Sequence, residues 1–78
     1  MSMNSSAELP DSLFQRAISL STGRSGRIDL VEAHMWFNIA AAGGDRAAAE
    51  HRDELAREMT REQVAAALRA ARDWVTHH

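Results

Sequence analysis

Histidines and carboxylates are the side chains of this chain that could bind a metal ion or transfer protons. His34 and His51 fall on different predicted helices, and neither has a second histidine or a carboxylate at the spacing that builds a metal face. Glu50 and Asp53 flank His51 but point around the helix. We therefore predict polar surface histidines, no metal site and no cofactor.

Nucleophilic catalysis finds no support in the sequence either. The chain has no cysteine, which excludes a thiol nucleophile, a thiolate zinc site and an iron–sulfur cluster. No serine lies in a glycine-flanked elbow, and no glycine-rich loop is suited to phosphate binding. Ser19, Ser21 and Thr22 fall at a helix end, where capping explains them. We predict that the protein is not an enzyme.

Length and charge limit the remaining classes. The 78 residues are enough for one domain, and a formal net charge of −2 argues against a dedicated nucleic-acid binder. No apolar run approaches the roughly 20 residues that span a bilayer, so no membrane insertion is expected. Residues 1–10 lack the basic start and apolar stretch of a signal peptide. The sequence thus predicts a cytoplasmic protein.

Helical spacing of apolar residues recurs along the chain, and no segment alternates with period two. We predict a flexible tail over residues 1–10 and helices over about 11–22, 29–42, 45–58 and 61–76. Expected caps are Asp11 or Ser12, Asp29 and Asp45. Glu32 adds the second half of a capping box to Asp29, and Thr60 with Gln63 forms another. The fold class is all-α, with four short helices in antiparallel hairpins, and the fourth helix should close the exposed side of the third.

Two aromatic sites differ in the role that the sequence suggests. Phe37 lies on the apolar stripe of the second helix and Trp36 lies beside it, and both are expected in the core. Trp74 lies near the chain end, where a small domain has difficulty burying an indole. Core and partner contact both stay open for Trp74.

Residues 29–48 resemble the Sel-one-like repeat, a relative of the tetratricopeptide repeats. The residues that carry the resemblance are Asp29, Ala33, Trp36, Phe37, Ala40, Ala41, Gly44 and Ala48. A weaker upstream match comprises Phe14, Ala17, Leu20 and Gly23, while Arg16 stands where the family usually has a leucine. The resemblance covers roughly Ser12 to Ala56 and implies a single repeat followed by a C-terminal capping helix, as in some bacterial members.

The same resemblance implies contact with another protein rather than chemistry. In repeats of this kind the first helix of each pair lines the concave side, which would place Gln15, Arg16, Ser19, His51 and Arg52 together. We take Arg16, Ser19, His51, Arg52 and Trp74 as the candidate partner contacts. The leading hypothesis is an adaptor, accessory subunit or regulator that binds a larger protein.

Two alternatives remain at this point. One is a structural homo-oligomer that pairs through the C-terminal helix, with Trp74, Val75 and Leu68 as its adhesive edge. The other is a DNA-binding helix-turn-helix with residues 60–75 as recognition helix, supported by Arg61, Arg69 and Arg72. Glu62 and Asp73 on that helix, together with the negative net charge, weaken the DNA-binding hypothesis.

Overall fold

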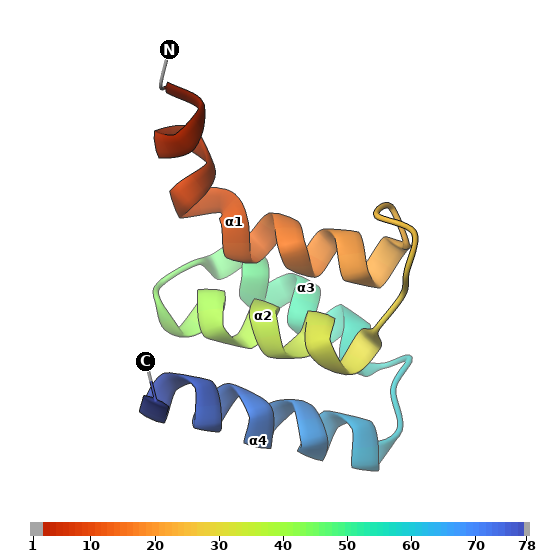
Figure 1. Ribbon diagram of the computed structural model, residues 1–78. Coiled ribbons are helices and arrows are strands. Elements are labelled where there is room, and N and C mark those ends of the chain that lie inside the picture. The colour runs from red at the N-terminus through yellow and green to blue at the C-terminus, as the bar shows by residue number, and fades with distance from the viewer. Residues whose placement is uncertain (1–2, 78) are drawn as a thin grey trace.

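Four helices make up the molecule, and one of them runs through its middle. The computed structural model describes residues 3–77, with the side chains of residues 13–77. The helices are α1 (Met3–Thr22), α2 (Leu30–Ala42), α3 (Arg46–Ala56) and α4 (Arg61–His77). No strand occurs in residues 3–77, so the predicted all-α class is confirmed. α1 and α4 lie on opposite sides of α2, and α3 lies behind it (Figure 1).

The composition of α2 explains its central place. Only Glu32, His34 and Asn38 are polar among its residues, so the helix is apolar around its whole circumference. Such a helix needs cover on several sides, and α1, α3 and α4 each pack against it. The expectation that α4 closes the exposed side of α3 is therefore wrong. α4 packs on α2 instead, because α2 offers apolar surface on the side that α1 and α3 leave open.

Alanines bring the helices close together. Ala17 of α1, Ala33 of α2, Ala48 of α3 and Ala67 of α4 have no exposed surface. Small side chains at a crossing let two helix axes approach closely. Of the four alanines that carry the resemblance, Ala33 and Ala48 are fully buried at such crossings, whereas Ala40 and Ala41 are only partly buried. The larger side chains of the core are Leu20, Trp36, Phe37, Ile39 and Leu55.

The starts of α2, α3 and α4 follow the predicted caps, with one exception in detail. An oxygen of the Asp29 carboxylate accepts a hydrogen bond from the backbone N–H of Glu32 at 3.0 Å, and Asp45 accepts one from Ala48 at 3.1 Å. Thr60 and Gln63 form the full capping box, at 3.0 and 2.8 Å. Glu32 does not return to the Asp29 backbone, whose N–H donates to the carbonyl of Leu20 at 3.0 Å. The Glu32 side chain is used elsewhere.

The first helix begins earlier than the sequence indicates. α1 starts at Met3 and includes Pro10, so neither Asp11 nor Ser12 is a cap and residues 3–10 are helical. Met1 and Ser2 of the predicted tail lie outside the described residues. A proline inside a helix removes one backbone hydrogen bond and bends the helix. The first turns of α1 do point away from the other helices (Figure 1).

The turn between α2 and α3 depends on a backbone conformation that favours glycine. Gly44 has φ of 107°, and its N–H donates to the carbonyl of Ala41 at 2.9 Å. The following N–H, of Asp45, donates to the carbonyl of Ala40 at 3.1 Å. These bonds satisfy carbonyls at the end of α2 and reverse the chain within a few residues. Gly44 thus provides the left-handed turn between two antiparallel helices.

Enlarging Ala33 tests the close approach of helices on α2. We expect Ala33→Leu to lower the free energy of unfolding by about 1–3 kcal/mol, because the added carbons enter space that is already filled. Ala65→Leu makes the same change at an exposed position of α4 and should stay within about 0.5 kcal/mol of the wild type. Urea unfolding followed by circular dichroism measures both. Equal stabilities of the two variants would contradict the packing.

A second pair of variants tests the turn. Gly44→Ala should destabilise the protein by about 1–2 kcal/mol, because a residue with a Cβ is strained at positive φ. Gly43→Ala is the matched control, since Gly43 has φ of −83° and an added Cβ would meet the carbonyl oxygens of Ala40 and Ile39 at 3.4 and 3.8 Å, which are ordinary contacts. We expect the control to melt at or above the wild-type temperature. A lower melting temperature for Gly43→Ala than for Gly44→Ala would show that the turn is described wrongly.

Candidate functional site

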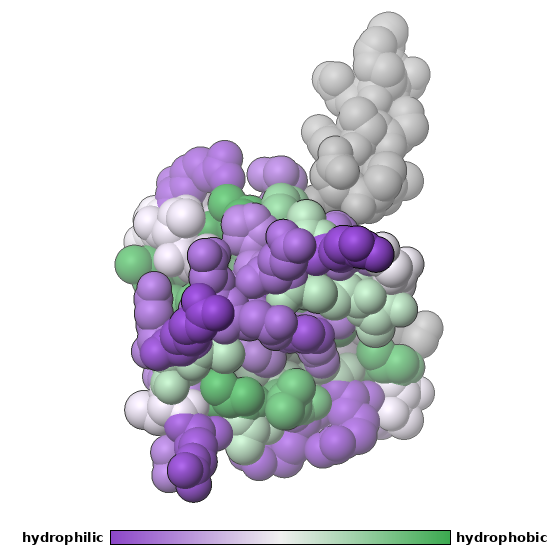
Figure 2. Space-filling view, turned by 180° about the vertical axis from the view of Figure 1, so that it is seen from behind, coloured by the Kyte–Doolittle hydropathy of each residue, from purple (hydrophilic) through white to green (hydrophobic). Residues whose placement is uncertain are grey.

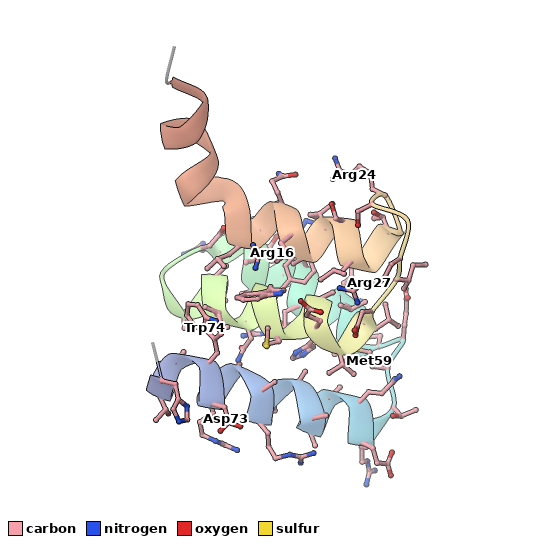
Figure 3. The ribbon with its side chains drawn as sticks, viewed as in Figure 1. Arg16, Arg24, Arg27, Met59, Asp73 and Trp74 are labelled. Atoms are coloured by element: carbon pink, nitrogen blue, oxygen red, sulfur yellow. The ribbon has the colours of Figure 1, made fainter. Side chains whose placement is uncertain are left out.

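Three helices meet at an arginine and two tryptophans. The guanidinium carbon of Arg16, on α1, lies 4.9 Å from the ring centre of Trp36, on α2. The ring of Trp74, on α4, meets the Trp36 ring edge-on at 5.6 Å between centroids, with an interplanar angle of 77°. Figure 3 shows Arg16 and Trp74 directed from α1 and α4 toward the same part of α2. We call these three residues the arginine–tryptophan face.

Trp36 is held in place by a chain of polar contacts. Its indole N–H donates to Glu32 at 3.0 Å, and Arg27 donates to the other oxygen of the same carboxylate at 3.3 Å. Arg27 also donates to Asp29 at 3.3 Å. The side chain of Arg27 is largely exposed, so the two ion pairs add little to stability. Their effect is to fix the Glu32 carboxylate, and through it the indole.

A shallow hollow lies beside this face, between α1, the following loop and the start of α2. It has a volume of about 490 Å³ and is lined by Gln15, Arg16, Ser19, Ser25, Arg27 and Glu32, with Leu20 at its base. We call it the α1–α2 hollow. Arg16 belongs both to the hollow and to the arginine–tryptophan face, so the two form one continuous surface.

The candidate partner residues do not all lie on this surface. Arg16 and Ser19 line the hollow, and Trp74 lies next to Trp36. His51 is on another side, where its ring stacks on Phe37 at 5.3 Å and meets Phe14 edge-on at 5.2 Å. The expectation that His51 lies on the same side as Arg16 and Ser19 is therefore wrong. Trp36 and Phe37 are adjacent on α2 and point to different faces, so their rings contact different residues.

Arg52 is held by contacts within the protein. Its Nη1 donates to the side-chain oxygen of Asn38, on α2, at 2.9 Å, and its Nε donates to Asp53 at 3.0 Å. The long-range bond to Asn38 ties α3 to the middle of α2. Arg52 therefore joins two helices, a role that its position in a run of charged residues did not suggest.

The aromatic residues of the core are where the sequence placed them. Trp36 is 6% exposed and Phe37 is 1% exposed, so the core prediction is confirmed for both. Trp74 is partly buried and packs against the core cluster. Its ring contact with Trp36 means that α4 is joined to the arginine–tryptophan face through an aromatic pair.

His34 is the residue that sequence reasoning misplaced. It is 3% exposed, not a surface histidine, and its Nδ1 has no hydrogen-bond partner in the described part of the chain. Burial lowers its pKa, the Arg52 charge lowers it further, and Asp53 opposes the change. The available signal was α2 itself, since His34 lies between apolar residues on a helix that is covered on several sides.

Among the side chains described, those of residues 13–77, no cluster of three or more histidine or acidic residues could bind a metal ion. Among the described helices, none is long and apolar enough to cross a membrane. The chain matches no protein-family model, no curated protein and no solved structure. What the site can do therefore rests on its own chemistry.

The burial of His34 predicts a pH-dependent stability. Because its folded-state pKa lies below the ordinary histidine value of about 6.5, the unfolded chain takes up a proton first as the pH falls. Stability is thus full above about pH 6.5 and declines below it. We expect His34→Leu to show a smaller decline in the free energy of unfolding between pH 7.5 and 5.5 than the wild type does.

The control for this experiment is His77→Gln, which removes an exposed histidine from the end of α4. It should retain the wild-type decline. Urea unfolding at a series of pH values measures all three proteins. If the wild type and His34→Leu decline in parallel, protonation of His34 does not limit stability in this range.

Proposed function

We propose that this chain is a protein-interaction module that binds a larger protein through the arginine–tryptophan face and the adjoining α1–α2 hollow. The observation that carries the proposal is the position of the exposed Arg16 side chain over a fixed indole. Arginine and tryptophan are the residues most enriched among those that dominate binding energy at interfaces. An arginine held against a ring loses less freedom when it binds a partner than a freely mobile one.

The resemblance to the Sel-one-like repeat supports the same class of function. It rests on residues 29–48, where buried Ala33 and Ala48, the Trp36–Phe37 pair and the positive φ of Gly44 agree with the packing expected of such a repeat. We propose that the chain is a minimal, single-repeat member, with α4 as its capping helix. In this proposal it serves as an adaptor, accessory subunit or regulator, without a catalytic step of its own.

A second candidate is self-association through α4. Leu68 and Val75 of this helix are 43% and 57% exposed, which is high for large apolar side chains. Together with Ile39, Ala42 and Ala71 they line a groove between α2 and α4. Apolar surface is visible low on the rear side of the molecule, where α4 runs (Figure 2). Pairing of two copies would cover these side chains.

One set of variants separates the two candidates. We expect the pure protein to be a monomer by light scattering, and a partner captured from lysate of its source to be lost with Arg16→Ala. An interface arginine of this kind contributes about 2 kcal/mol or more, which corresponds to roughly 30-fold weaker binding. Arg69→Ala removes an exposed arginine from α4 and should leave capture unchanged.

The self-association candidate makes the opposite forecast. The protein would then have a dimer mass that Leu68→Glu with Val75→Glu reduces to a monomer, and Arg16→Ala would have no effect. Arg16→Ala and Arg69→Ala could also weaken partner capture equally. This result would count against both candidates, because it would indicate general charge attraction and not a specific binding surface.

A further inference from the structure

Among the described residues, Arg16 differs from Arg27 and Arg52 in having no acidic partner. Its guanidinium lies over the Trp36 ring instead. Arg27 is paired with Asp29 and Glu32, and Arg52 is paired with Asp53. A guanidinium has five N–H donors, and a ring face occupies none of them. The donors of Arg16 are therefore available to an acceptor that enters the α1–α2 hollow.

The rest of the hollow holds one engaged carboxylate and three neutral side chains that can donate hydrogen bonds. The carboxylate of Glu32 is already engaged by the Trp36 indole and by Arg27. The hollow also holds one amide and two hydroxyls, which make no side-chain hydrogen bond to other described residues. They belong to Gln15, Ser19 and Ser25. An incoming group would meet one free cation surrounded by neutral donors. This is an environment for an anion.

The number of unpaired cations that line the hollow indicates which kind of anion it can bind. A carboxylate carries a single charge and a planar pair of oxygens, which matches the fork of one guanidinium. A phosphate dianion calls for more positive charge than the lining of the hollow supplies, because Arg27 is neutralised by Asp29 and Glu32 and Arg24 does not line the hollow. The open, shallow form of the hollow suits a side chain on the surface of another protein.

The charge of the whole molecule would orient such a ligand. Near the hollow, Arg16, Arg24 and Arg27 outnumber Asp29 and Glu32, and Figure 3 shows the three arginines along α1 and its loop. Residues 45–58 carry five carboxylates and three arginines. An acidic segment is therefore attracted to the hollow and repelled from α3.

We propose that the α1–α2 hollow binds a carboxylate side chain from an acidic segment of the partner protein, with Arg16 as the anchor. The inference rests on the proposed interaction function and specifies the chemistry of the partner. Ser19, Ser25 and Gln15 would donate to the oxygen that Arg16 leaves free. Asp and Glu are both suitable, since the chemistry that is recognised is the carboxylate.

A synthetic peptide tests this directly. The probe is a blocked ten-residue peptide of alternating glutamate and serine, titrated by calorimetry at about 0.15 M salt. The chain has two tryptophans, and Trp36 contacts Arg16, so indole fluorescence reports whether binding occurs at this face. We expect saturable binding with a fluorescence change, and no binding of the same peptide with glutamine in place of glutamate.

Three variants locate the site. Arg16→Gln should weaken the glutamate peptide by about tenfold or more, because both the charge and the fork are lost. Arg16→Lys should lose part of the affinity, since the charge remains and the planar fork does not. Arg69→Gln removes an equal charge from the surface of α4 and should stay within about twofold of the wild type. Circular dichroism confirms that each variant is folded.

Several results would overturn the inference. Absence of glutamate-peptide binding would do so, and so would equal weakening by Arg16→Gln and Arg69→Gln, which would indicate nonspecific attraction. Inorganic phosphate that competes with the peptide at equal or lower concentration would make this a small-anion site instead. If the peptide fails while partner capture still depends on Arg16, the interaction module stands and the carboxylate is wrong. If the peptide binds at Arg16 and no partner is captured, the carboxylate site stands and the proposed interaction function is wrong.

Discussion

The fold depends on one constraint, which is that α2 has no polar side. A helix that is apolar around its circumference cannot be stable in water until several neighbours cover it. α1, α3 and α4 do so together, and the buried alanines let each of them approach closely. The adjacent residues Trp36 and Phe37 then determine what lies on two of the sides. Phe37 takes the rings of Phe14 and His51, and Trp36 takes Arg16 and Trp74.

Local signals predicted α2, α3 and α4 well, though not the start of α1, because the groups that determine these three helices are close in sequence. Asp29, Asp45 and Thr60 with Gln63 cap the helices that follow them, and each such bond spans only a few residues. The same is true of the turn at Gly44, where the backbone conformation requires a residue without a side chain. Helical periodicity gave the all-α class for the same reason.

Contacts between helices were harder to predict from the sequence. The sequence did not reveal that α4 packs on α2 rather than on α3, because amphipathicity shows which side of a helix is buried and not which neighbour buries it. His34 and Glu32 were misjudged for a related reason. A stripe drawn along α2 assumes an exposed opposite side, and α2 has none. The candidate site was predicted in part, with Arg16, Ser19 and Trp74 near one surface and His51 and Arg52 elsewhere.

Two residues of the arginine–tryptophan face differ in what they contribute to folding. The fold depends on buried Trp36 and does not depend on exposed Arg16. Truncation of a buried tryptophan such as Trp36 typically costs about 3–5 kcal/mol, which is close to the whole stability expected of a domain this small. The exposed Arg16 contributes about 0.5–1 kcal/mol through its contact with the ring. Loss of binding in a Trp36 variant would therefore say little about recognition. Arg16 is the position at which recognition can be altered while α2 remains covered.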